Sequence, residues 1–218
     1  MIIIGVTGAT GTGKSTVSKI LDEDYFFRII NADYISFNEA QPGTQYLKEI
    51  EKTFGKKVIN KDGSLNRKLL GDIIFNDHEQ KAKLNKLTKK YVVKAIEELL
   101  TLFKEVSKSI KGHKEFKDIM DAIVIDAALL HEFKLDRECN YVICLTASDD
   151  VKLKRIMERS NLSEEEAKVR IKSQKEYEDV FEKSDYVVEN NGTVEELKPK
   201  IDEVIKDIAR RENLKLIL

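Results

Sequence analysis

The chain has 218 residues, 41% of them hydrophobic, which is enough for one large domain or for a core domain that carries inserted lobes. Its formal net charge is −1, so no basic excess indicates nucleic acid or an anionic membrane as a partner. The first residues lack the pattern of a signal peptide, and no apolar run is long enough to span a bilayer. We therefore expect a cytoplasmic protein with no membrane partner, and a monomer by default.

Five short apolar runs alternate with helical patterns along the chain. The runs cover residues 1–6, 27–30, 119–125, 141–145 and 186–188, and polar or small residues follow each of them. Helical spacing of apolar residues predicts helices over residues 14–21, 44–54, 67–75, 77–103 and from Val194 onward, the last with Thr193 as its N-cap. This alternation predicts an α/β fold with about five parallel strands between layers of helices. Ligands bind beyond the carboxyl ends of the strands in such sheets.

The glycine-rich segment GATGTGKS, residues 8–15, matches the phosphate-binding pattern GxxxxGK[ST] between the first predicted strand and the first predicted helix. Glycines let successive backbone N–H groups turn inward, and the helix N-terminus adds its positive end. Lys14 is expected to reach the β- and γ-phosphates, and the Ser15 hydroxyl to bind Mg²⁺. The predicted contacts to a nucleoside triphosphate are Gly11, Thr12, Gly13, Lys14, Ser15 and Thr16.

The long stretch between the second and third apolar runs contains helical patterns and no clear strand. It is too long for a single crossover helix, so we expect an inserted helical lobe that is suited to holding a second substrate. Residues 104–117 within it are highly charged and are expected to form an exposed extension or loop. The two cysteines, Cys139 and Cys144, lie around the fourth run and are expected to be small buried hydrophobes, not a disulfide pair.

A second helical segment, residues 150–180, is predicted to close over the triphosphate as a lid. Arg155 and Arg159 are four positions apart, so they share one helix face, where they would stabilise charge on the transferring group. Ser163 and Glu166 form the pattern of a capping box for a following helix. No NKxD motif follows the fourth run, which disfavours a GTPase. The small size, the inserted helical lobe and the arginine-rich late segment favour a kinase of small metabolites.

Taken together, these motifs resemble those of the dephospho-coenzyme A kinase family over nearly the whole chain. The segments that carry the resemblance are IGVTGATGTGKSTV (4–17), NAD (31–33), QPGT (41–44), DGSLNRKLLG (62–71), DAALLHE (126–132), RIMER (155–159), SEEEA (163–167) and the segment from Asn190 to Leu197. The sequence departs from the family pattern at Asn31, Ala128 and His131, where the family shows an aspartate, a proline and an aromatic residue.

The resemblance implies a P-loop kinase fold with a helical acceptor-binding insertion and a helical lid. It divides the chain into a nucleotide-binding core (residues 1–33, 119–149 and 184–218), a CoA-binding lobe (34–118) and the lid (150–180). The implied reaction transfers phosphate from ATP, with Mg²⁺, to the ribose 3′-hydroxyl of dephospho-CoA.

The resemblance also suggests roles for single residues. Asp33 is the expected base, and Lys14, Arg155 and Arg159 complete the catalytic set. The implied substrate contacts are Asp33, Arg67, Leu129 and Glu132; Asn190 and Gly192 would present backbone to adenine. Asp126, at the end of the third run, would hold the magnesium shell together with Ser15, or orient the loop.

Two alternatives stay open at this point. One is another P-loop kinase of nucleotides or small metabolites, with a different acceptor. The other is a nucleotide-binding module without transfer activity, which only the departures at Asn31 and Ala128 support.

Overall fold

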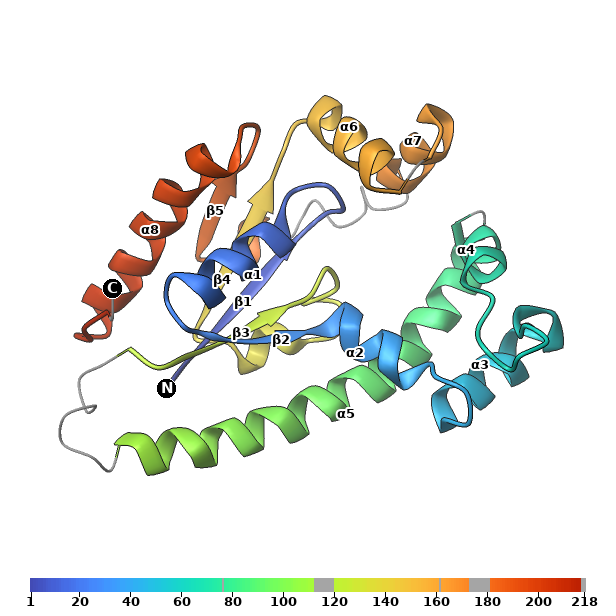
Figure 1. The fold of residues 1–218 in the computed structure, drawn as a ribbon, viewed down its shortest axis with the longest axis horizontal. Coiled ribbons are helices and arrows are strands. Elements are labelled where there is room, and N and C mark those ends of the chain that lie inside the picture. Colours follow the sequence, from blue (N-terminus) through green and yellow to red (C-terminus); the bar gives the residue numbers. More distant parts are fainter. Residues whose placement is uncertain (76, 112–119, 161, 173–180, 217–218) are drawn as a thin grey trace. The chain divides into compact units, whose positions relative to one another are not determined.

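The computed structural model describes residues 1–75, 77–111, 120–160, 162–172 and 181–216 (Figure 1). Its elements are β1 (Ile2–Gly8), α1 (Lys14–Glu23), β2 (Arg28–Asn31), α2 (Ala32–Glu39), α3 (Gln45–Phe54), η1 (Lys56–Val58), α4 (Arg67–Phe75), α5 (His78–Lys111), β3 (Ala122–Asp126), η3 (Leu135–Glu138), β4 (Tyr141–Thr146), α6 (Asp149–Ser160), α7 (Glu164–Lys172), β5 (Tyr186–Glu189) and α8 (Val194–Arg211). The strands form one sheet in the order β2-β3-β1-β4-β5. The pairs β1 with β3, β1 with β4 and β4 with β5 are parallel, which confirms the predicted fold class.

The centre of the sheet is buried because β1 lies between two other strands and is covered on both faces. Alternate residues of a strand face opposite sides of the sheet. Ile2, Ile4 and Val6 face a hydrophobic cluster that α1 and α8 complete. Gly5 faces the other side, where a Cβ atom would lie 2.7 Å from Cδ2 of Leu130. The absence of a side chain at Gly5 therefore lets the turn after β3 pack directly on β1.

The chain divides into two compact units. The first contains residues 1–30 and 99–218 and holds the sheet; the second contains residues 31–98. The second unit has its own apolar cluster, made by Ala40, Tyr46, Ile50, Phe54, Val58 and Leu70. The predicted lobe covered residues 34–118, so the unit observed begins slightly earlier and ends in the middle of α5.

Of the exposed extension or loop expected over residues 104–117, the loop is wrong for residues 104–111, which continue α5, with residues 104–109 largely exposed; residues 112–117 lie outside the described part of the chain. Leu100 and Ser107 are both buried at helical spacing. The Ser107 hydroxyl hydrogen-bonds to the Asp121 carboxylate, and the Arg28 guanidinium lies over the Phe103 ring at 5.5 Å. A polar residue at a buried position hid the helical pattern in the sequence.

The short helix α2 has no counterpart among the predicted elements. Its N-cap is Asn31, whose side-chain oxygen accepts a hydrogen bond of 2.7 Å from the backbone N–H of Tyr34. Ala32 is its only buried residue, so it carries no amphipathic pattern that a sequence could reveal. The cap matters because it fixes the residues that follow β2, Asp33 among them.

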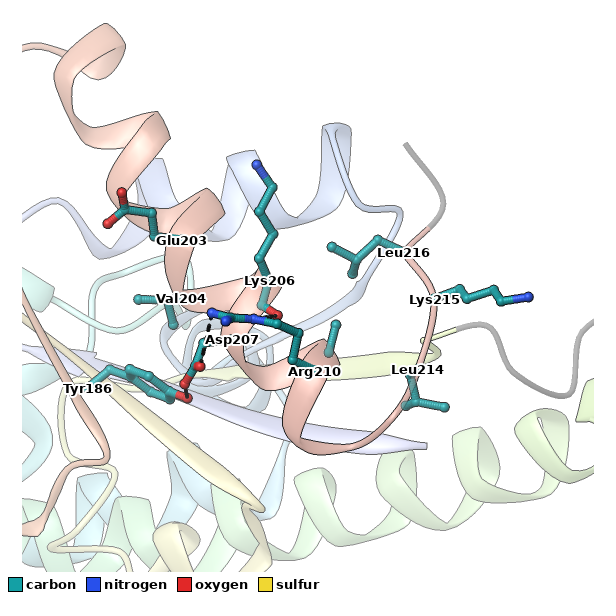
Figure 2. Close-up of a pocket in the computed structure, with 10 residues that line it drawn as sticks. Tyr186, Glu203, Val204, Lys206, Asp207, Arg210, Leu214, Lys215 and Leu216 are labelled. Atoms are coloured by element: carbon teal, nitrogen blue, oxygen red, sulfur yellow. Dashed lines mark hydrogen bonds and ion pairs between the residues drawn. The ribbon is translucent and has the colours of Figure 1, made fainter.

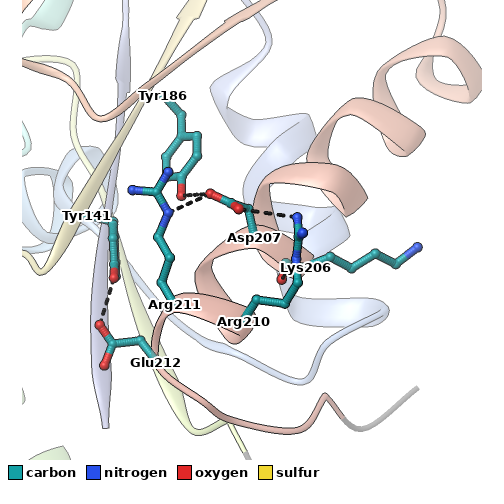
Figure 3. A network of polar contacts seen from close by, with 7 residues as sticks. All are labelled: Tyr141, Tyr186, Lys206, Asp207, Arg210, Arg211 and Glu212. Carbon is teal, nitrogen blue, oxygen red and sulfur yellow. Dashed lines mark hydrogen bonds and ion pairs between the residues drawn. The ribbon is translucent and has the colours of Figure 1, made fainter.

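At the amino ends of β4 and β5, a polar network ties the sheet to the end of α8 (Figure 3). The Tyr186 hydroxyl donates to Asp207 at 2.7 Å, and Arg211 donates to the same carboxylate at 2.7 Å. Nearby, the Tyr141 hydroxyl donates to Glu212 at 2.7 Å. Burial and the bond to Asp207 raise the pKa of Tyr186 to about 12.

A groove of about 930 Å³ lies beside this network, between α8 and the segment that follows it (Figure 2). Tyr186, the first residue of β5, lines it together with Leu214 and Leu216. The groove therefore lies at the amino ends of the strands, at the edge opposite to the one where parallel sheets bind ligands.

Both cysteines are free thiols; Cys144 is buried, as expected, whereas Cys139 is half-buried. Burial raises the pKa of the Cys144 thiol to about 11 and that of the Cys139 thiol to about 12. Among the described residues, no helix contains a segment long and apolar enough to span a bilayer.

Replacing Asp207 by Asn tests the network at the end of α8. The bond from Tyr186 and the contact with Arg211 hold the pKa of Asp207 below its usual value of 3.8. A carboxylate with a lowered pKa stabilises the fold above its usual pKa, and this contribution is lost as the pH falls through the lowered value. We expect Asp207→Asn to melt at a lower temperature than wild type at neutral pH, with the difference shrinking below pH 3.8.

Thermal melts of both proteins across this range make the measurement. Glu203→Gln, which removes an exposed carboxylate one turn earlier on α8, is the matched control. A difference between Asp207→Asn and wild type that does not change with pH would contradict the role given to the charge.

Candidate active site

The glycine loop connects β1 to α1 and adopts backbone conformations that favour glycine. Gly8, Gly11 and Gly13 have φ values of 143°, 86° and 98°. The buried Thr12 closes the loop on itself, since its hydroxyl and its backbone N–H both donate to Ala9 O, at 2.8 and 3.3 Å. The loop is therefore already turned in the way that directs successive backbone N–H groups toward a bound anion.

The first turn of α1 follows the loop without a side-chain cap at Gly13. An uncapped helix N-terminus has N–H groups that an anion can take as its ligands. The Lys14 ammonium donates to Gly8 O at 2.8 Å and to Ala9 O at 3.3 Å, so it lies against the loop. Ser15 is exposed and Thr16 is half-buried in this turn. This arrangement can bind a polyphosphate.

Asp126 ends β3, in register with Val6 of β1 two residues before the loop begins. It is 4% exposed, and its Oδ2 atom accepts a hydrogen bond of 2.9 Å from the Ser18 hydroxyl of α1. Sequence analysis missed Ser18, although its position four residues after Lys14 places it on the loop side of the helix. The bond fixes one oxygen of the carboxylate at the edge of the sheet that carries the glycine loop.

Arg155 of α6 connects the glycine loop to the loop after β5. Its guanidinium donates to the carbonyl oxygens of Gly11, Asn190 and Gly192 at 3.3, 2.9 and 2.8 Å. The structure thus brings four predicted site residues from three distant segments of the chain into contact. Arg159, one turn further along α6, is exposed.

The turn after β3 is anchored by Leu130, which is fully buried. Nearby in the turn, Leu129 is half-buried and Glu132 is exposed. The His131 ring is packed, with Nδ1 3.4 Å from Asp136 Oδ2. The turn therefore offers Leu129 and Glu132 to a ligand, while Leu130 and His131 are packed.

Asp33 and Arg67 belong to the second unit. Asp33 is exposed in the first turn of α2. Arg67 begins α4, where its guanidinium lies 4.3 Å from the centre of the Phe37 ring and donates to Phe37 O at 3.3 Å. Phe37, four positions after Asp33, shares its helix face and is 48% exposed. Sequence analysis missed Phe37, because a single aromatic residue on a short helix carries no motif.

Comparison with known proteins identifies the family. The dephospho-CoA kinase family model matches residues 2–196. A dephospho-CoA kinase of Listeria monocytogenes is 33% identical over 213 residues, covering 96% of this chain and 98% of that protein. One from Bacillus cereus is 34% identical over 205 residues, covering 94% of this chain and 96% of its own.

Solved structures agree with this result. Dephospho-CoA kinase from Campylobacter jejuni superposes with a TM-score of 0.64 and 26% identity, covering 96% of this chain and 98% of that one. Shikimate kinase from Bacteroides thetaiotaomicron, with a TM-score of 0.50, 13% identity and coverage of 94% and 98%, shares the fold. The match of the family model and the relatives of similar length together establish that the chain belongs to the dephospho-CoA kinase family.

Proposed function

We propose a mechanism by which this chain carries out the reaction of its family, the ATP-dependent phosphorylation of dephospho-CoA in coenzyme A biosynthesis. The observation that carries it is the glycine loop, with its positive φ values and the Lys14 ammonium already lying against it. In the reaction, a bond forms between the ribose 3′-oxygen and the γ-phosphorus, and the bond from that phosphorus to the bridging oxygen of ADP breaks.

The loop and Lys14 bind the phosphates of ATP. Two of the present partners of Lys14 are neutral carbonyl groups. A phosphate oxygen carries negative charge and forms a stronger, charge-assisted bond with an ammonium group. Lys14 therefore exchanges its carbonyl partners for the β- and γ-phosphates, where it stabilises the charge that develops during transfer.

Ser15 and Asp126 fit a magnesium ion that accompanies ATP. Both supply oxygen atoms, the ligand type that Mg²⁺ prefers, and Ser15 is exposed at the N-terminus of α1. One carboxylate oxygen of Asp126 is held by Ser18, which orients the other. When bound, the ion neutralises phosphate charge.

Asp33 is the base in this mechanism. It is an exposed carboxylate just past β2, and Asn31 fixes the turn that holds it. Because the transition state of phosphoryl transfer is loose, the carboxylate needs to accept the hydroxyl proton only late. Arg67, Leu129 and Glu132 are the proposed acceptor contacts. Phe37 joins them, since it supports the Arg67 guanidinium.

The two lid arginines have different roles in this proposal. Two carbonyl partners of Arg155 lie in the loop after β5, the proposed position of adenine, and the third, Gly11 O, lies in the glycine loop, so Arg155 serves nucleotide binding. Arg159 is exposed and one turn away, and it is the arginine that meets the transferring phosphoryl group.

The remaining predictions concern the setting of the enzyme. A cytoplasmic location and a monomeric state stay predictions. Two alternatives are another P-loop kinase activity and a nucleotide-binding module without transfer activity. A test with dephospho-CoA as the substrate distinguishes both from the proposed reaction.

Mass spectrometry of CoA formed from MgATP and dephospho-CoA tests the reaction and its base. We expect wild-type protein to form CoA and Asp33→Asn to be slower by about 10² or more. Glu39→Gln, which changes a carboxylate on another face of α2, is expected to match wild type. Wild-type protein that binds ATP but forms no CoA would contradict the acceptor, and an active Asp33→Asn would contradict the base.

Ser18→Ala tests the support of Asp126. Loss of a residue that orients a metal ligand lowers metal affinity or activity by about tenfold or more. We expect the variant to need about tenfold more Mg²⁺ for half-maximal rate. Titration of the rate with Mg²⁺ measures this, with Lys19→Ala, at the next and exposed position of α1, as the control. An unchanged magnesium requirement would remove Ser18 from the site.

Arg155→Met and Arg159→Met separate the two arginine roles. We expect Arg155→Met to raise the KM for ATP about tenfold with little change in kcat, because it removes nucleotide contacts. Arg159→Met should lower kcat by about 10², the usual loss for a group that stabilises transition-state charge. Steady-state kinetics measure both, and Lys154→Met on the exposed side of α6 is the control. Equal effects of the two variants on kcat would refute the division.

A further inference from the structure

Asn190 is a buried polar residue at the start of the loop after β5. It is 5% exposed, and its backbone N–H donates to Thr146 O at the end of β4 at 2.8 Å. The neighbouring strand therefore fixes the position of its backbone. A side chain that leaves a fixed backbone and is itself buried has little freedom to move.

The side-chain amide of Asn190 spans two parts of the nucleotide site. Its Nδ2 atom donates to the carbonyl oxygen of Thr12 in the glycine loop at 2.9 Å. Its Oδ1 atom accepts from Nη2 of Arg155 at 3.4 Å. An amide can donate and accept at the same time, whereas a carboxylate of the same shape can only accept.

The bond to Thr12 has a consequence for the next peptide group. A trans peptide unit directs its C=O and its N–H to opposite sides of the chain. With the Thr12 carbonyl held by Asn190, the N–H of Gly13 points away from Asn190. In a glycine loop of this pattern, backbone N–H groups surround the phosphates, so this orientation makes the Gly13 N–H a candidate ligand of the phosphates.

Gly13 itself is shaped by the same contact. Its φ of 98° is rarely adopted by other residues, and a Cβ atom there would lie 2.3 Å from Nδ2 of Asn190. The amide of Asn190 thus fills the space that a side chain at residue 13 would need. The bond from Asn190 Nδ2 to Thr12 O therefore requires glycine at residue 13, because any larger residue there would clash with the amide.

We propose that the side chain of Asn190 is a positioning residue for the phosphate loop: it orients the peptide between Thr12 and Gly13 so that the Gly13 N–H meets the triphosphate. The proposal rests on the proposed function for the identity of the ligand, ATP. Besides the expected backbone contact of Asn190 with adenine, its side chain thus has a separate role in phosphate binding. The loop is set before the nucleotide binds.

Calorimetric titration of the full chain with three probes tests this role: MgATP, inorganic tripolyphosphate and adenosine. Asn190→Asp keeps the shape of the side chain and removes the donor; Asn190→Ala removes the donor without adding charge. The control is Asn191→Asp, which keeps the oxygen that accepts from Ser148 N at 2.8 Å and removes an amide donor whose partner, Glu189 Oε1 at 2.9 Å, lies outside the glycine loop. Thermal melts of all variants establish that they are folded, and Asn190→Ala replaces Asn190→Asp if the added charge prevents folding.

We expect both Asn190 variants to bind MgATP and tripolyphosphate about tenfold more weakly, the loss of one buried hydrogen bond, with adenosine binding unchanged. The KM for ATP should rise by a similar factor while that for dephospho-CoA stays constant.

Unchanged tripolyphosphate binding with weaker adenosine binding would overturn the proposal and assign the Asn190 side chain to adenine binding. If the wild-type protein binds ATP but not tripolyphosphate, the claim that the loop is ordered for phosphate before the nucleotide binds would be overturned. Failure of the proposed function would look different, as normal binding of all probes without formation of CoA.

Discussion

The parallel pairing of β1 with β3 and β4 is the constraint on which the rest of the site depends. It brings the end of β3, with Asp126, into register with β1 just before the glycine loop, and it brings the end of β4 beside that loop. Because β1 is buried on both faces, small residues are needed where neighbours approach it, as Gly5 is against Leu130. The position of the chemistry thus follows from the packing of one strand.

Around this frame, the glycine loop is supported from outside as well as by its own turns. Thr12 closes it internally, Asn190 holds it from the loop after β5, and Arg155 holds it from α6. All three contacts use backbone carbonyl oxygens of the loop as acceptors. A loop with the same sequence but without these contacts would have to be ordered by the nucleotide, at a cost in affinity.

The strands, most helices and the glycine loop could be predicted from the sequence because each depends on local patterns. Apolar runs mark buried strands, and the spacing of glycines, lysine and serine specifies the loop. The rest could not be predicted, because it depends on contacts between distant residues or breaks the pattern. Ser18 meets a carboxylate 108 positions away. The end of α5 has the polar Ser107 at a buried position, which breaks the apolar spacing of a helix. Phe37 belongs to the site only through its contact with Arg67. The chemical roles of the site residues stay predictions.

The buried thiol of Cys144 and the half-buried thiol of Cys139 have a consequence for an enzyme whose substrate and product both carry a thiol group. Disulfide exchange requires a thiolate, and burial raises the pKa of Cys144 to about 11 and that of Cys139 to about 12. At neutral pH a thiol with a pKa this far raised stays almost entirely protonated, whereas a few per cent of an ordinary exposed cysteine is ionised. Oxidised coenzyme A therefore finds almost no nucleophile on these two residues. The environment of Cys139 and Cys144 therefore disfavours a mixed disulfide between the protein and coenzyme A at these two positions.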